Sequence, residues 1–103
     1  MIFEYKARIA EVVSGNTIEA SLDLGFGVTK YLPLTLAGID PASTGLDALA
    51  YIYGWLHENN WNAKIRVYKK KSEYVAYVFP VDLEDESVTL NSDLIEGDYA
   101  IGS

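Results

Sequence analysis

Apolar and polar residues alternate along much of this chain, with the period of two that a half-buried β-strand shows. The alternation is unbroken over 17–23 and returns over 61–68. Apolar, β-branched and aromatic residues also fill 3–13, 28–39 and 74–81, and Gly25 and Gly27 separate two of these runs as a hairpin turn does. We therefore expect five strands. Because Pro33 cannot donate a hydrogen bond to a neighbouring strand, the third strand should have an edge position or a bulge there.

Two stretches change to the spacing of a helix. Apolar residues recur at helical intervals over 45–59, and Ser43 or Thr44 is placed to cap the start of that helix. Leu90, Leu94 and Ile95 give the same spacing to a shorter stretch, with a second helix expected near 90–96. The order β-β-β-α-β-β-α is that of a five-stranded OB-fold barrel, a mainly β, α+β fold with a helix between strands three and four. The expected core comprises Ile9, Ile18, Ala20, Leu22, Leu36, Leu49, Ile52, Leu56, Ile65, Val67, Val78 and Leu94.

Length, charge and residue usage limit what such a barrel can do. The 103 residues suit one domain, 1–103, and the absence of cysteine excludes disulfides and thiolate metal sites. The formal net charge of −7 opposes the binding of polyanions. No apolar run approaches the ~18 residues of a membrane span, and no signal segment opens the chain. We expect a cytoplasmic protein without a cofactor and without membrane contact.

Three segments match motifs of one nuclease family. Residues 14–17 read Ser-Gly-Asn-Thr, residues 35–43 read Thr-Leu-Ala-Gly-Ile-Asp-Pro-Ala-Ser, and the tail up to Ala100 is close to Ser-x-Asn-x-x-Leu-x-x-x-Gly-x-Ala. They resemble the Asp-Gly-Asp-Thr turn, the Arg-Leu-x-Gly-Ile-Asp-x-Pro-Glu signature and the tail of the staphylococcal-nuclease-like (SNase-like) proteins, also called thermonucleases. The resemblance covers about 5–100 and implies an SNase-like OB-fold barrel.

The resemblance also implies that the active site is lost. In the family, carboxylates hold calcium, two arginines hold the phosphate and a glutamate activates water, because a hard cation and a reacting phosphodiester need fixed opposite charges. Asp40 matches one calcium ligand, but the other four places carry Asn16, Thr35, Ser43 and Glu73. We therefore expect a pseudoenzyme without nuclease activity or bound metal. A residual calcium-dependent nuclease is the least favoured alternative.

Two charged segments are candidate binding surfaces. A basic hairpin with tyrosines can stack bases and contact the phosphates of a single strand, whereas an acidic segment can dock a basic protein surface. We favour a protein-interaction module with an unidentified protein partner, and a single-stranded nucleic-acid-binding protein is the alternative. The DLGFG sequence at 23–27 resembles nuclease-like domains of phages and mobile elements, which implies an inhibitor or accessory protein that meets a host protein in the host cytoplasm. The candidate residues are Arg66, Tyr68, Lys69, Lys70, Lys71 and Tyr74 for nucleic acid, and Asp82, Glu84, Asp85 and Glu86 for protein.

Overall fold

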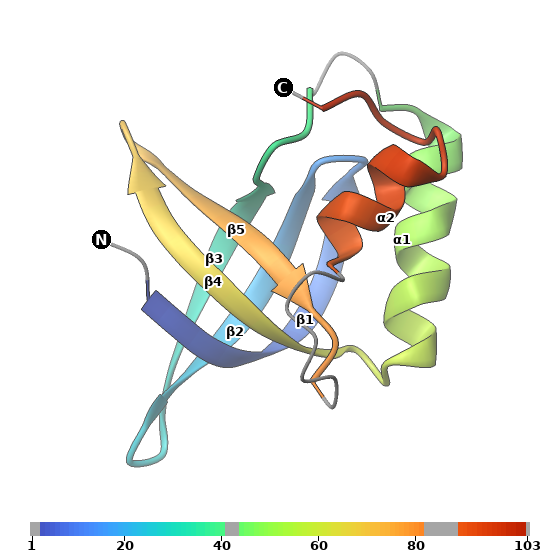
Figure 1. The fold of residues 1–103 in the computed structure, drawn as a ribbon. Coiled ribbons are helices and arrows are strands. Elements are labelled where there is room, and N and C mark those ends of the chain that lie inside the picture. The colour runs from blue at the N-terminus through green and yellow to red at the C-terminus, as the bar shows by residue number, and fades with distance from the viewer. Residues whose placement is uncertain (1–2, 41–43, 82–88, 103) are drawn as a thin grey trace.

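The predicted order of strands and helices is confirmed by the computed structural model, which describes residues 3–40, 44–81 and 89–102. The strands close into a barrel in the order β1-β2-β3-β5-β4, with the two helices on one side of it (Figure 1). This is the expected mainly β, OB-like architecture. The elements are β1 (Phe3–Ser14), β2 (Thr17–Gly25), β3 (Val28–Leu36), α1 (Leu46–Glu58), β4 (Asn62–Lys70), β5 (Glu73–Phe79) and α2 (Leu90–Glu96).

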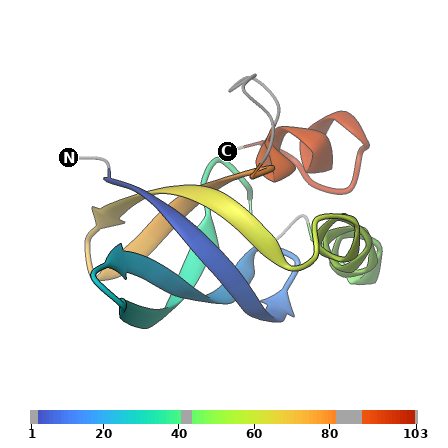
Figure 2. The ribbon, with the colours of Figure 1, turned by 90° about the horizontal axis from the view of Figure 1, so that it is seen from below.

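Strand β1 is long and bent, and it pairs with a different strand on each side. Its first half pairs with β4, its second half pairs with β2, and the register with β2 shifts between Ile9 and Glu11. Such a bulge bends a strand and increases its twist. Figure 2 shows β1 crossing the barrel between these two neighbours.

The barrel closes through a narrow parallel seam between β3 and β5. Only two pairs form it, Thr35 with Val75 and Leu36 with Ala76. The preceding part of β3 pairs with β2 alone among the described strands, and Pro33 lies in this part, opposite Glu19. The predicted edge position of Pro33 is therefore confirmed. As a consequence, β2 and β3 extend beyond the barrel as a hairpin, seen at the lower left of Figure 1.

The expected core is confirmed except at one position. All the predicted core residues are buried apart from Leu49, which is partly buried against the core. Helix α1 buries Ala48, Ile52, Trp55 and Leu56 on the barrel. None of the helices in the described part of the chain has the length and apolar character needed to cross a membrane.

The expected cap of α1 by Thr44 is wrong. Gly45 holds the N-cap position, so no side chain caps the helix there. Ser43 lies outside the described residues. Thr44 instead faces the turn between β1 and β2, where a Cβ built on Gly15 would lie 2.5 Å from the Thr44 Cβ. This close approach requires glycine at position 15. Leu46, the first residue of α1, is 82% exposed.

One buried polar side chain joins α2 to the seam. The Asn91 side-chain nitrogen donates to the carbonyl oxygens of Ala37 (2.8 Å) and Ala76 (3.1 Å). Its oxygen accepts from the backbone nitrogen of Val78 at 2.9 Å. A capping box between Thr89 and Ser92 starts α2 and fixes its direction. Asn91 therefore adds three hydrogen bonds where the β3–β5 ladder has few of its own.

Helix α2 and the segment that follows it also pack on α1, through the Asp93 carboxylate of α2 and the ring of Tyr99 after it. The rings of Tyr51 and Tyr99 stack with centroids 4.6 Å apart. Burial raises the pKa of the Asp93 carboxyl, the charge of Glu96 raises it further, and a hydrogen bond from the Trp55 side chain partly offsets the rise. The contact between the helices therefore holds an acid that ionises less readily than in the unfolded chain.

Replacing Asn91 with alanine should lower the free energy of unfolding by about 2 kcal/mol or more. The change removes the bonds to the Val78 nitrogen and the Ala37 carbonyl, and each buried polar group left without a partner costs about 1–3 kcal/mol. The Ala76 carbonyl keeps its bond from the Ala37 nitrogen. Urea denaturation measures this change. The matched control is Asn62→Ala, which removes one exposed hydrogen bond to the Asn60 carbonyl and should change stability by less than about 0.5 kcal/mol. Equal losses in the two variants would contradict the role assigned to Asn91.

Asp93→Asn should flatten the dependence of stability on pH immediately above 3.8, the ordinary pKa of aspartate. Because folding raises this pKa, the folded state binds the proton more tightly, and stability declines as pH rises through the folded pKa. The variant lacks this decline. Thermal unfolding across that range tests the expectation, with Asp47→Asn on α1 as the charge-matched control. The same flattening in both variants would assign the effect to net charge.

Candidate functional site

Asn16 and Thr35 stand at two positions that correspond, by sequence resemblance, to SNase-like active-site residues. In this structure both make contacts within the barrel. The Asn16 side-chain oxygen accepts from the hydroxyls of Ser14 (2.7 Å) and Thr17 (3.4 Å), so it serves the turn between β1 and β2. Its backbone carbonyl accepts from the Leu36 nitrogen at 2.7 Å. Thr35 lies in the seam, paired with Thr17 on β2 and with Val75 on β5.

The other matching positions are spread along the chain. The Asp40 backbone nitrogen donates to the Ile101 carbonyl at 2.8 Å, which ties this loop to the end of the chain. Glu73 begins β5 opposite Lys70, and Ser43 lies outside the described residues. Within the described ranges, no three His, Cys, Asp or Glu side chains are grouped so that they could hold a metal ion.

An apolar groove is lined by residues from strand ends that lie away from the helices; these strand ends are on the left of Figure 1. It has a volume of about 450 Å³ and is built from the starts of β1, β3 and β5 and the ends of β2 and β4. Its lining contains two lysines and no carboxylate, although the chain as a whole has a net charge of −7. The lining residues are Phe3, Tyr5, Leu22, Leu24, Lys30, Leu32, Val67, Tyr68, Lys69 and Tyr74.

The groove includes half of the predicted nucleic-acid candidates. Tyr68, Lys69 and Tyr74 line it, and the Lys69 Nζ lies 5.7 Å from the centre of the Tyr74 ring. Arg66 points elsewhere, since its Nε forms an ion pair with Glu4 at 3.0 Å. Lys70 and Lys71 are exposed at the hairpin turn and do not line the groove.

Sequence reasoning missed the contribution of β3 to this groove. Lys30 and Leu32 belong to the lining, whereas Tyr31 between them is 54% exposed and is not among the lining residues. The period-two pattern of the third strand was the signal that could have placed Lys30 and Leu32 on one face. The predicted acidic surface, Asp82 with Glu84, Asp85 and Glu86, lies outside the described residues.

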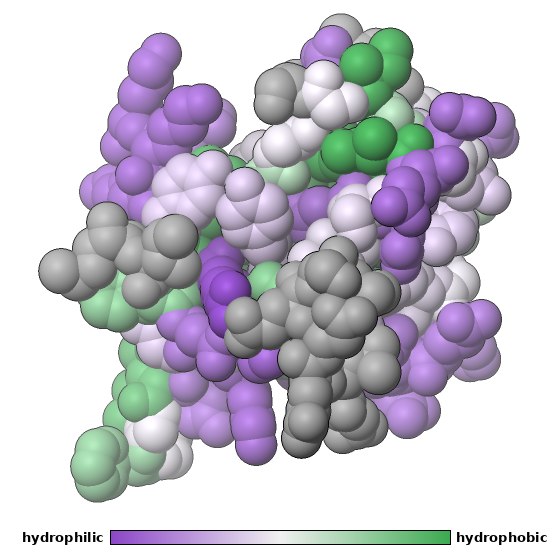
Figure 3. Space-filling model, viewed as in Figure 1, coloured by the Kyte–Doolittle hydropathy of each residue, from purple (hydrophilic) through white to green (hydrophobic). Residues whose placement is uncertain are grey.

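The hairpin beside the groove presents a fully exposed phenylalanine. Phe26 stands at the tip of the β2–β3 hairpin with a relative exposure of 106%, flanked by exposed Leu24 and Val28. In Figure 3 the apolar patch at the lower left covers this hairpin. We call the groove together with Leu24, Phe26 and Val28 the mouth face.

The backbone of the tip has a conformation that suits other residues better. Gly25, Phe26 and Gly27 have φ values of 87°, 55° and 73°, and the Asp23 side chain accepts from the Gly25 nitrogen at 2.9 Å. Positive φ is unfavourable for a bulky L-residue and is ordinarily taken by glycine, asparagine or aspartate. Because Phe26 makes no packing contact that compensates for this cost, its presence points to a role outside folding.

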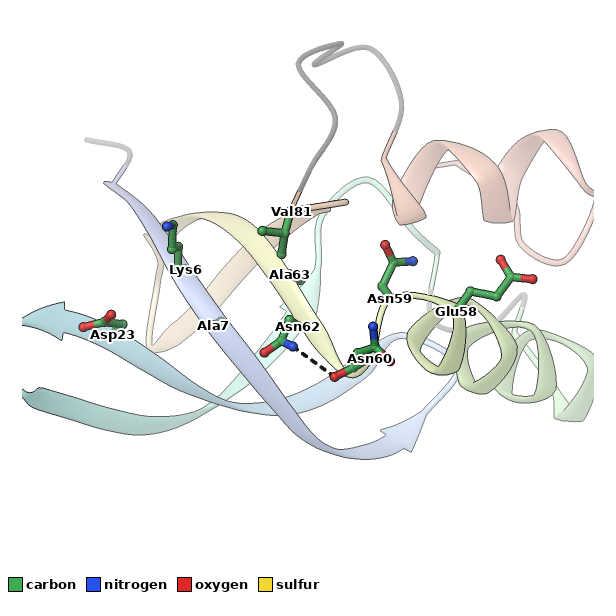
Figure 4. A pocket seen from close by; sticks show the side chains of 9 residues that line it. All are labelled: Lys6, Ala7, Asp23, Glu58, Asn59, Asn60, Asn62, Ala63 and Val81. Carbon is green, nitrogen blue, oxygen red and sulfur yellow. Dashed lines mark hydrogen bonds between the residues drawn. The ribbon is translucent and has the colours of Figure 1, made fainter.

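A second, polar pocket lies between β1, β4 and the end of α1, and Figure 4 shows its lining. The side chains of Asp23 and Glu58 stand at opposite ends of it, and the one hydrogen bond drawn runs from the Asn62 side chain to the Asn60 carbonyl at 3.1 Å. The lining groups do not converge on a common point. This pocket therefore has less of the character of a binding site than the groove.

The chain matches no protein-family model and no curated protein sequence. The assignment of function therefore depends on the barrel and its surfaces.

Phe26→Asn should leave the free energy of unfolding unchanged or raise it by up to about 1 kcal/mol, because asparagine tolerates positive φ better than phenylalanine. Denaturation at low micromolar protein concentration measures the change. Phe79→Asn is the contrasting control, because Phe79 is 4% exposed and its loss should cost about 3 kcal/mol or more. A large loss of stability on changing Phe26 would show that its ring packs within the folded monomer.

Proposed function

We propose that the protein is a non-catalytic binding module built on an SNase-like OB-fold barrel, and that it binds a partner protein through the mouth face. Three features support the SNase-like assignment: the barrel order, the helix between strands three and four, and the motif residues around Asp40 and Asn91. An inhibitor or accessory role of phage type remains a proposal that rests on the resemblance.

The loss of catalysis is supported by what the substituted positions do. Phosphodiester hydrolysis needs fixed positive charge on the phosphate and anionic oxygens on a metal. Thr35 lies within the seam, the Asn16 oxygen serves a turn, and Glu73 has the opposite sign to the expected arginine. The removal of one such transition-state contact costs about 10²-fold or more in rate, so four substitutions leave no effective nuclease.

The observation that carries protein binding is the continuity of the exposed apolar tip with the apolar groove. Leu24 lines the groove and is separated from exposed Phe26 by Gly25 alone, so the groove and the tip lie next to each other. Contiguous exposed apolar surface with a polar rim marks protein-interaction sites. Because the groove is apolar and is also lined by Lys30 and Lys69, it should bind a partner segment that has an apolar side chain next to a carboxylate.

Single-stranded nucleic acid is the second candidate, and the same lysines favour it. Tyr68 and Tyr74 offer rings for base stacking, and Lys30 and Lys69 offer charge for a phosphate. Two properties place it second. The overall charge of −7 repels a polyanion, and the lining is dominated by aliphatic and aromatic side chains.

A random peptide display library, selected against the immobilised protein, should yield peptides with an aromatic or leucine anchor next to aspartate or glutamate. Lys30→Glu/Lys69→Glu should weaken the binding of a synthetic copy by about tenfold or more, as a loss of 1.4 kcal/mol implies. Lys70→Glu/Lys71→Glu changes the net charge equally at lysines outside the groove and should have little effect. Fluorescence anisotropy measures both.

If the two double variants weakened peptide binding equally, or if neither changed it, binding at the mouth face would be contradicted. A labelled oligo-dT strand tested in parallel decides the second candidate. Micromolar binding lost in Lys69→Ala/Lys70→Ala/Lys71→Ala, without any peptide enrichment, would make nucleic acid the better assignment. Calcium-dependent cleavage of that strand, abolished by Asp40→Ala, would overturn the non-catalytic assignment.

A further inference from the structure

We propose that the mouth face pairs with the mouth face of a second copy of this chain, so that the Phe26 ring of each molecule sits in the groove of the other. This inference rests on the proposed function, because it names an occupant for the same surface. It accounts for both an exposed anchor and an unfilled apolar groove on a single barrel.

The tip of the hairpin is preorganised as an anchor. The hydrogen bond from the Gly25 nitrogen to the Asp23 carboxylate and the three successive positive φ values define its conformation without any partner. A segment that is ordered before binding loses less conformational entropy when it binds. Phenylalanine at such a tip can bury a large apolar surface on docking, of about 150–250 Å² per aromatic side chain.

The groove has the chemistry to receive this ring. Its floor is apolar, formed in part by Leu22, Leu32 and Val67, and its volume of about 450 Å³ is of the order that binding pockets have. Phe3 and Tyr5 stack on each other with ring centroids 6.3 Å apart along one wall. Aromatic rings gain additional energy from stacked or edge-to-face contacts with a further ring.

The anchor and the groove are placed as two-fold symmetry requires. In a symmetric dimer the same patch faces itself, so the anchor of one copy meets the groove of the other only if both lie on one face. Leu24 lines the groove and is separated from Phe26 by Gly25 alone. A single two-fold axis beside Leu24 can therefore form both contacts together.

The contact between the two copies is apolar. The nearest carboxylate in sequence, Asp23, bonds to the Gly25 nitrogen and lines the polar pocket, whereas its neighbours Leu22 and Leu24, on the opposite face of β2, line the groove. Two hairpin tips form a small interface, and two chains of −7 repel each other, so the dimer should be weak, with a Kd of micromolar or above.

Sedimentation equilibrium of the full chain, from about 10 µM to 1 mM, should show a monomer–dimer equilibrium in that Kd range. Phe26→Ser should raise the Kd at least tenfold. Leu46→Ser removes an apolar side chain that is 82% exposed near the start of α1 and should leave the Kd unchanged. Equal Kd values for the wild type and Phe26→Ser, or a dimer lost only in Leu46→Ser, would overturn the proposal.

A mixing experiment tests the arrangement itself. Phe26→Ser loses the anchor but keeps the groove, whereas Phe3→Lys places a charged side chain in the wall of the groove but keeps the anchor, so each variant alone should dimerise at least tenfold more weakly. Mixed in equal amounts, they should form a heterodimer, because the Phe26 ring of the second variant then meets the intact groove of the first. Absence of this rescue would contradict the exchange of tips. A monomeric wild type that still binds selected peptides in the groove would overturn self-association while leaving the proposed function in place.

Discussion

The buried Asn91 side chain holds together the part of the barrel on which the remaining structure depends. Only two residue pairs close β3 on β5, and an open seam would leave backbone groups unpaired beside the core. The amide of Asn91 bonds to Ala37, Ala76 and Val78, so one side chain extends the seam and attaches α2 to it.

The β3–β5 seam closes the barrel near Leu36, at the end of β3, and the groove lies toward the start of that strand. Because β3 pairs with β5 only near Leu36, the β2–β3 hairpin extends beyond the barrel. Neither α1 nor α2 contributes a residue to the groove at the mouth. Charge follows the same division. Helices α1 and α2 contain four carboxylates and neither lysine nor arginine, whereas the groove is lined by two lysines and no carboxylate. The net charge of −7 is therefore distributed unevenly between the helical end of the barrel and the mouth.

The sequence allowed the elements and the core to be predicted, because strand alternation and helical spacing are local signals. It did not allow the site to be predicted in the same way. Lys30 and Lys69 line the same groove only because the barrel closes. Thr44, expected to cap α1, lies against the distant turn at Gly15, and Gly45 holds the N-cap position. Asn91 belongs to the tail motif, but the motif assigned it no structural role. Its three partners come from other parts of the chain, and no local pattern reveals such contacts.

The central claim is that the mouth of the barrel, and not its helical end, is the binding surface. Amide chemical shifts of the isotope-labelled protein, followed by NMR while a selected peptide is added, test this most directly. We predict saturable shifts at Gly25 and Gly27 and along the groove, at Lys30 and Lys69, with little change at Gly54 on α1. Shifts concentrated on α1, on α2 or within 82–88, with the mouth unchanged, would contradict the account.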